Sequence, residues 1–365
     1  MNISEDGIRH SKFKFNKNEC KVLSEDWKNF VSKIKKCPQK KFSEKGIVFT
    51  AGGITYVTCA WVSISMLRKL GCNLPIEIWH NGNEVSAAVM LKFKHLDVEF
   101  RDFSELGEVT LHGYMLKPLA ILGSRFAEIL YLDVDNVCVK NPEYLFHSKE
   151  YLEFGSVFWP DYWHTAKDNS IWSITGSKSF SIPEQESGQV LVNKVRCWRE
   201  LQLCLYFNQM SNYYYKLLLG DKDTFKFAWL ALKTDFHMVA KMVGTCGYVI
   251  DDQFYGNTMV QHDTTGNIIF LHRNLLKWDI TFKNEMVWKV IKGFYDHPKT
   301  KKIIYNTYPI SGLAIDIAGD VYDLDFKEIF GDLELWCQEF LMDWRESKDY
   351  VDFFNHLHFL RSRHH

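Results

Sequence analysis

The sequence predicts an α/β fold built on a mostly parallel sheet with helices on both faces. Two observations support this prediction: a strand–helix–strand unit near residue 50 and a long apolar strand that ends in two carboxylates near residue 133. Both are typical of parallel sheets, whose strands are buried on both faces and joined by crossover helices. Three sections are expected: a polar, helical N-terminal extension (1–44), the main α/β domain (45–285) and a mostly helical C-terminal extension (286–365).

The strand–helix–strand unit comprises a short strand at Gly46–Thr50, a helix over Val57–Leu70 and a second strand at Ile76–His80. This spacing is typical of a βαβ crossover, so the two strands should be parallel. The intervening turn, Ala51-Gly52-Gly53, would let a nucleotide approach the backbone closely; a tight turn without a ligand is the alternative. The turn lacks both the G-x-G-x-x-G fingerprint and the P-loop pattern, which argues against dinucleotide- and ATP-binding folds.

The second observation is Ile129–Asn136, in which four apolar residues run into Asp133 and Asp135. Strand periodicity predicts that both carboxylates lie on the same side of the strand, at its carboxyl end, where open α/β sheets bind ligands. Two hard oxygen ligands suit Mg²⁺ or Mn²⁺ carrying phosphates. A solvated turn or a helix cap is the alternative.

The amino-acid composition limits the classes of protein to which this chain can belong. With 365 residues and 46% hydrophobic content, the chain can bury a large core, and its net charge of −1 provides no basic field for nucleic acid. The nine cysteines lack zinc-site spacing, and several, such as Cys59 and Cys138, are expected to be buried thiols. The sequence shows neither a signal-peptide apolar region nor an apolar run of transmembrane length. A cytoplasmic protein is therefore expected; a protein of the Golgi or secretory lumen is the alternative.

Taken together, the motifs resemble the fungal α-mannosyltransferases of glycosyltransferase family 71. The matching segments keep the family's order and are 46–53, 63–68, 71–77, 114–118, 131–136, 158–163, 186–189, 220–225, 255–261 and 270–274. The resemblance implies a GT-A catalytic domain, GDP-mannose as donor, Mn²⁺ or Mg²⁺, retention of the anomeric configuration and a glycan or other hydroxyl acceptor. UDP-glucose or UDP-galactose is the alternative donor, and a catalytically dead carbohydrate-binding protein is the non-enzymatic alternative.

The layout also looks like family 8, which includes glycogenin. Lys117 falls where that family has a donor-contacting lysine. His272 and Lys277 resemble its late element, in which the histidine completes the metal site and the lysine meets the diphosphate. His262 competes with His272 as third metal ligand. The likeness implies that the metal ligands are Asp133, Asp135 and His272. The residues expected to contact the donor are Thr50, Ala51, Gly52, Gly53, Lys117, Asp133, Asp135 and Lys277.

Polar side chains are also expected beside the transferred sugar, and the candidates are Asp161, Glu186, Gln189, Asp221 and Lys222. A double displacement needs a carboxylate close to the anomeric carbon. A front-face mechanism needs only a polar site that stabilises the oxocarbenium-like state. Asp221 and Lys222 stand where family 8 has an Asp-Gln pair, with Lys in place of Gln; for Asp221, a helix cap is the alternative.

Overall fold

A computed structural model of the chain describes residues 2–3, 7–107, 113–308, 312–352 and 354. The chain forms two compact units, each assembled from separate segments. Unit 1 comprises Met1–Gly46, Thr110–Tyr131 and Leu145–Met242. Unit 2 comprises Ile47–Val109, Leu132–Tyr144 and Val243–His365. The three sections expected from the sequence do not coincide with these units, and their boundaries stay a prediction.

Unit 2 contains the predicted strand–helix–strand unit, which is confirmed. Strand β3 (Ser43–Thr50), helix α2 (Gly53–Lys69) and strand β4 (Ile76–His80) follow one another, and β3 pairs with β4 in parallel. Strand β5 (Val98–Asp102) extends the sheet, again in parallel. The apolar residues 47–49 are fully buried, as expected for a strand covered on both faces.

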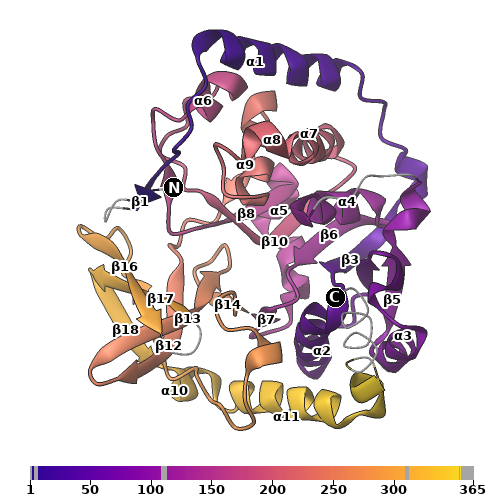
Figure 1. Cartoon of the computed structure of the whole chain (residues 1–365), viewed down its shortest axis with the longest axis vertical. Coiled ribbons are helices and arrows are strands. Elements are labelled where there is room, and N and C mark those ends of the chain that lie inside the picture. Colours follow the sequence, from indigo (N-terminus) through magenta and orange to yellow (C-terminus); the bar gives the residue numbers. More distant parts are fainter. Residues whose placement is uncertain (1, 4–6, 108–112, 309–311, 353, 355–365) are drawn as a thin grey trace, which may run out of the picture. The chain divides into compact units, whose positions relative to one another are not determined.

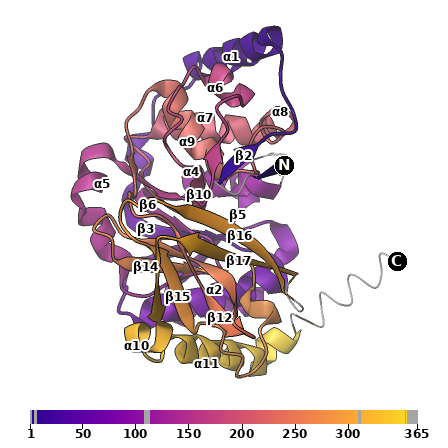
Figure 2. The ribbon, with the colours of Figure 1, turned by 90° about the vertical axis from the view of Figure 1, so that its left-hand side faces the viewer.

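A second sheet of unit 2 is antiparallel, with six strands in the order β18-β15-β12-β13-β14-β7. Its strands are β7 (Asn136–Cys138), β12 (Gly244–Ile250), β13 (Gln253–His262), β14 (Ile268–His272), β15 (Val290–Phe294) and β18 (Val321–Asp325). Strands β16 (Lys301–Tyr308) and β17 (Gly312–Gly319) pair with each other, and β17 contacts β13; Figure 2 shows this pair beside the sheet.

The section 286–365 is less helical than the sequence analysis expected. Four strands, β15 to β18, precede helices α10 (Phe326–Phe330) and α11 (Leu333–Glu346). Ile315 and Ile317 are buried two residues apart, so the apolar period here is that of a strand. Helix α11 packs against α2, and Figure 1 shows the two together.

Unit 1 is organised around strands β8 (Ser156–Pro160) and β10 (Gln185–Asn193), which pair antiparallel. Strand β11 (His237–Met238) pairs with β8 in parallel, and β6 (Phe126–Leu132) neighbours β10 in the sheet. The longer helices of this unit are α1 (Lys17–Ser32), α4 (Leu116–Gly123), α7 (Trp198–Gln209) and α9 (Lys222–Leu232). Short helices are α5 (Lys149–Phe154), α6 (Ser170–Thr175) and α8 (Ser211–Tyr214).

The α/β class and the parallel pairing of the first strands are therefore confirmed. The N-terminal section also contributes strands, β1 (Asn2–Ile3) and β2 (Ile8–His10). They form a small sheet in unit 1 together with β9 (His164–Thr165). The sequence contains one N-glycosylation sequon, Asn2-Ile3-Ser4, and its Ser4 lies outside the described residues. In the part of the chain that the structure describes, no helix combines the length and apolar character needed to span a membrane.

Candidate functional site

Asp133 and Asp135 lie in a turn between β6 and β7, at the carboxyl end of the buried strand. The strand ends at Leu132, and the turn is closed by a hydrogen bond of 3.0 Å from the Asn136 amide to the Asp133 carbonyl. Strand alternation was therefore the wrong reason to expect the carboxylates together, because neither residue belongs to a strand. The turn achieves the same result: both carboxylates approach the same histidine.

That histidine is His272, the last residue of β14. Its Nε2 lies 3.2 Å from Asp135 Oδ1 and 4.0 Å from Asp133 Oδ2. Strand β14 pairs with β7, with His272 opposite Asn136, and this register brings the imidazole to the turn. The three side chains offer one ligand atom each, all within 4.8 Å of one another. Among the described residues His262 belongs to no such group.

The donor set fits a divalent cation. It combines two carboxylate oxygens with one imidazole nitrogen, which suits Mn²⁺ and is acceptable to Mg²⁺. The Asp135 side chain is 3% exposed, whereas that of Asp133 is 27% exposed. The buried carboxylate orients the group, and the partly exposed carboxylate lies where a ligand can reach it.

Lys277 forms an ion pair with Asp135 Oδ2 and precedes the short 3-10 helix η7 (Trp278–Ile280). Burial alone would raise the pKa of Asp135, but the charges and hydrogen bonds of His272 and Lys277 hold that pKa well below its usual range. Burial likewise would lower the pKa of Lys277, and Asp135 raises it overall. Both groups are therefore charged at neutral pH.

The segment that carries Lys277 is anchored by two arginines. Arg273 is fully buried and donates from Nε to the Leu276 carbonyl (2.6 Å) and from Nη2 to Thr281 Oγ1 (2.7 Å). Arg345 of α11 donates to the carbonyls of Thr281 (2.6 Å) and Asp279 (2.5 Å). Sequence reasoning missed both residues. Helix α11 thus holds η7 and Thr281, which follow Lys277 directly in the chain.

The turn 50–53 joins β3 to α2 in unit 2, as the sequence analysis expected. Gly53 has φ 72°, a left-handed conformation that favours glycine. A Cβ on Gly52 would lie 2.0 Å from the Glu84 carboxylate, so the backbone approaches this side chain closely. Contact of Thr50, Ala51, Gly52 and Gly53 with a nucleotide stays a prediction.

In unit 1, Lys117, Ser187 and Asp221 form one cluster. The Lys117 ammonium donates to the carbonyl and to Oγ of Ser187, both at 2.9 Å, and lies 3.2 Å from Asp221 Oδ2. Ser187 Oγ also donates to Asp221 Oδ2 at 3.1 Å. Asp221 stands at the N-terminus of α9, yet its side chain makes no capping hydrogen bond. Helix capping therefore does not explain Asp221; the contact with Lys117 does.

Lys222 and Asp161, also in unit 1, form a buried ion pair. The Lys222 ammonium lies 3.1 Å from Glu184, which sequence reasoning missed. The other two candidates, Glu186 and Gln189, lie on β10, where Glu186 accepts a hydrogen bond from the Gly188 amide (2.7 Å) and Gln189 is fully buried. All five expected sugar-site residues are thus in unit 1, and the expected metal ligands and Lys277 are in unit 2. Their roles stay predictions.

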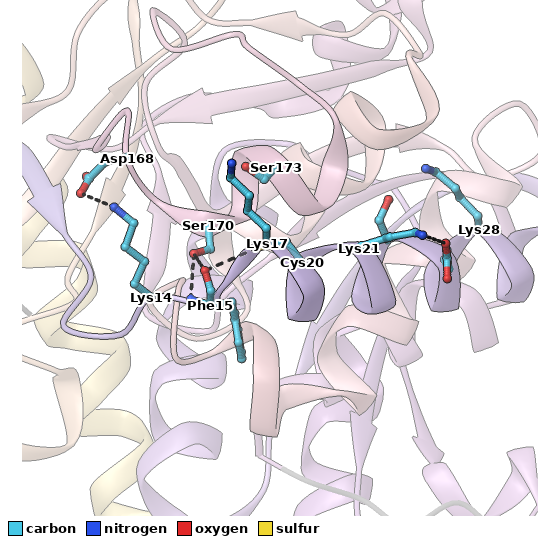
Figure 3. A pocket seen from close by; sticks show the side chains of 11 residues that line it. Lys14, Phe15, Lys17, Cys20, Lys21, Lys28, Asp168, Ser170 and Ser173 are labelled. Carbon is cyan, nitrogen blue, oxygen red and sulfur yellow. Dashed lines mark hydrogen bonds and ion pairs between the residues drawn. The ribbon is translucent and has the colours of Figure 1, made fainter.

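A pocket of about 550 Å³ lies between α1 and α6 of unit 1. Figure 3 shows that lysines line it, including Lys17, Lys21 and Lys28 along one side of α1. Lys14 lies 3.5 Å from Asp168 and Lys21 lies 3.8 Å from Glu25, so part of this charge is neutralised locally. This pocket is lined by none of the residues that the sequence analysis assigned to the metal, the donor or the sugar.

A family model described as "Mannosyltransferase putative" matches residues 44–185 and 178–263, which is more than half of the chain. The chain belongs to this mannosyltransferase family. The resemblance found in the sequence is thereby confirmed, and the match includes both Asp133 and Asp135.

Similar curated proteins come from yeasts. Alpha-1,2-mannosyltransferase MNN22 of Candida albicans is 30% identical over 71% of this chain and 54% of its own length. MNN21 of the same species is 29% identical over 64% of this chain and 45% of its own. Alpha-1,2-mannosyltransferase MNN2 of Saccharomyces cerevisiae is 26% identical over 67% and 50%. The chain spans about half the length of the curated relatives it matches.

Two solved structures with partial likeness are glycosyltransferases. Galactosyltransferase LgtC, in complex with donor and acceptor sugar analogs, has a TM-score of 0.38 and 14% identity over 54% of this chain and 73% of its own. GlyE of Streptococcus pneumoniae has a TM-score of 0.37 and 14% identity over 54% and 45%. Likeness at this level carries no conclusion about function.

The relatives contradict the cellular location that the sequence analysis predicted. The cytoplasmic prediction is wrong, because the relatives are MNN-type α-1,2-mannosyltransferases, which act on secretory glycans in the Golgi lumen. That prediction rested on the absence of an apolar leader or anchor in the printed sequence. Such an absence does not determine location.

Proposed function

We propose that the chain is a metal-dependent retaining mannosyltransferase that transfers an α-mannosyl group from GDP-mannose to a hydroxyl of a glycan or another acceptor. The observation that carries this proposal is the group of Asp133, Asp135 and His272 in a member of a mannosyltransferase family. The relatives are named alpha-1,2-mannosyltransferases, which supports mannose as the transferred sugar. GDP follows from the family resemblance.

Cleavage of a sugar–phosphate bond leaves extra negative charge on the departing nucleoside diphosphate. Asp133, Asp135 and His272 would hold Mn²⁺ or Mg²⁺, which when bound supplies positive charge to the diphosphate. Lys277, beside Asp135, contributes a second cation for the same purpose. Lys117 is proposed as a further phosphate contact, with its ammonium oriented by Ser187 and Asp221.

For the sugar, the contacts favour a front-face transfer. The carboxylates of Asp161 and Asp221 each lie against a lysine ammonium, which reduces their strength as nucleophiles. These two pairs would instead fix hydrogen-bonding groups around the sugar and stabilise charge in the transition state. Glu186 and Gln189 of β10 are proposed as further hydrogen-bonding groups for the sugar.

A turnover assay tests the proposal. The chain is incubated with GDP-mannose, UDP-glucose or UDP-galactose, with an α-mannoside acceptor, and with Mn²⁺ or EDTA. GDP release and mannosylated product are expected only with GDP-mannose and Mn²⁺. Preference for a UDP-sugar would refute the donor. Turnover of none of the three sugars, by a protein shown to be folded, would refute the enzymatic function.

A further inference from the structure

A buried network of charged side chains in unit 1 includes Arg9, from the N-terminal section 1–44, which contains none of the site residues expected from the sequence. Arg9 is the central residue of β2, which pairs in parallel with β9. The strand is fixed by hydrogen bonds from the His164 amide to the Gly7 carbonyl (2.8 Å) and from the Ala166 amide to the Arg9 carbonyl (3.1 Å). This pairing holds the Arg9 side chain at 0% exposure inside unit 1.

Arg9 holds Glu184 at two points. Its Nε donates to Oε2 of Glu184 at 2.8 Å, and its Nη2 lies 2.6 Å from Oε1. Thr165 donates to the same Oε1 at 3.0 Å. A planar guanidinium matches a carboxylate in this way, so the orientation of Glu184 is fixed.

Glu184 in turn determines where Lys222 lies. Oε2 of Glu184, the oxygen that accepts from Arg9 Nε, is 3.1 Å from the Lys222 ammonium, which also pairs with Asp161. Because Arg9 already neutralises part of the negative charge on Glu184 Oε2, the Lys222 ammonium is shared between Glu184 and Asp161. Without Arg9, Glu184 would attract the ammonium more strongly and Asp161 would lose it.

Among the residues that the structure describes, the network has equal numbers of positive and negative groups. Its cations are Arg9, Lys222 and Lys226, and its anions are Asp161, Glu184 and Asp223. Four of the six are fully buried, whereas Asp161 and Lys222 are each 8% exposed. The network therefore runs from a dry interior to Asp161 and Lys222, two of the residues proposed for the sugar. Burial alone would lower the pKa of Lys222, but Asp161 and Glu184 raise it, so the lysine is charged.

We infer that Arg9 is a positioning residue for sugar transfer: it restrains Glu184 so that the Lys222 ammonium stays on Asp161. This inference rests on the proposed function, since it assigns Asp161 and Lys222 to the transferred sugar. The N-terminal strand is on this view part of the transfer machinery.

Three variants test the inference. Arg9→Gln removes the charge, Arg9→Lys keeps the charge but lacks the planar fork, and Arg9→Gln combined with Glu184→Gln restores charge balance. His10→Ala is the matched control, because His10 is the next residue of β2 and its side chain is 52% exposed. Each protein is assayed for kcat per folded molecule and for the half-saturating Mn²⁺ concentration, and Lys222 is located in crystal structures.

In Arg9→Gln, Lys222 should turn from Asp161 to Glu184, and kcat should fall about tenfold or more, because a small misplacement near a reacting centre is costly. The half-saturating Mn²⁺ concentration should not change, and the double variant should regain most of the kcat. If Arg9→Gln does not fold, Arg9→Lys is judged by the same measurements.

A folded Arg9 variant with Lys222 still on Asp161, or with unchanged kcat despite a lower Tm, overturns the inference and leaves Arg9 a purely structural residue. Failure of the proposed function gives a different result: the unmodified protein does not turn over GDP-mannose. The position of Lys222 in the crystal structures then still decides whether Arg9 places it.

Discussion

The acidic group of unit 2 and the charge network of unit 1 use the same kinds of residue in opposite ways. In unit 2, two carboxylates and an imidazole converge, and one carboxylate is 27% exposed. In unit 1, Glu184 and Asp223 are fully buried, and each lies against two cationic side chains. The first arrangement suits an added ligand, and the second satisfies its charges within the protein.

The unit 2 group and the unit 1 network also differ in the balance of their charges. With His272 neutral, as metal binding requires, the described side chains of the unit 2 group are two carboxylates, Asp133 and Asp135, and one ammonium, Lys277. Counted over the described residues, the unit 1 network has three charges of each sign. A cation therefore stabilises the first group, whereas removal of any one member leaves the second with an uncompensated buried charge. Function should be lost more readily in unit 2 and stability more readily in unit 1.

The largest expected effect is on activity in unit 2. Asp133→Asn and Asp135→Asn each remove a charge needed for the metal but keep the side-chain shape. Since the metal supplies several kcal/mol of transition-state stabilisation, turnover should fall about a hundredfold or more. Mn²⁺-dependent turnover and circular dichroism, measured on the same samples, check this. Near-normal activity in either folded variant would show that the group does not bind the metal.

The next largest effect is expected on stability, and two lysine variants compare the two units. Urea unfolding measures the free energy of unfolding of each. Lys222→Met leaves Asp161 and Glu184 without their shared cation in a buried site, and such a loss costs about 3–5 kcal/mol. Lys277→Met also takes a cation from a buried carboxylate, but Lys277 is 31% exposed and Asp135 keeps its contact with His272. The loss should therefore be smaller, about 1–3 kcal/mol, while donor binding weakens. Equal losses of stability would mean that the two regions do not differ as proposed.

Acid sensitivity should also separate the regions. Burial tends to raise the pKa of Glu184, but Lys222 and Arg9 outweigh it and lower that pKa to about 2. A carboxylate with a depressed pKa stabilises the fold above its unfolded pKa of about 4.3, and this stabilisation is lost as pH falls through the folded value. The difference in unfolding free energy between the unmodified protein and Glu184→Gln should therefore shrink from pH 5 towards about pH 2.

Asp223, in the same network, should affect stability with the opposite pH dependence. Burial raises its pKa, so its contribution to stability is lost as pH rises. Asp223→Asn should give a difference that changes with pH in the other direction. The same trend in both variants would contradict the contacts described for the network.

The unit 2 group could be predicted from the sequence because its signals are local. An apolar strand running into Asp133 and Asp135 and a second apolar strand ending at His272 each mark a strand end. Two predictions for unit 2 were wrong in detail. The carboxylates lie in a turn and not on a strand. The strands within 290–325 were not predicted, because their alternation of apolar and polar residues is short. Contacts of His262 and the donor contacts of turn 50–53 could not be settled by pattern alone.

The unit 1 network could not be predicted, because its partners are far apart in sequence. Arg9 and Glu184 are separated by 175 positions and belong to no motif. A lone arginine in a polar N-terminal segment has the composition of a solvated surface, and only the pairing of β2 with β9 buries it. Asp161 and Lys222 were named from resemblance, without any sign that they pair.

The smallest expected effect concerns α11, which anchors the segment carrying Lys277. Arg345→Ala removes hydrogen bonds to the carbonyls of Thr281 and Asp279, and losing such bonds to a charged group costs about 1–3 kcal/mol. Because these carbonyls follow His272 and Lys277 closely in the chain, the loosened segment should also weaken Mn²⁺ binding, by about tenfold or less. Glu346→Ala, an exposed neighbour in the same helix, is the control. Calorimetric titration with Mn²⁺ and urea unfolding separate the two effects. If Arg345→Ala lowers stability but leaves Mn²⁺ affinity unchanged, α11 only covers unit 2, and the metal group is rigid without it.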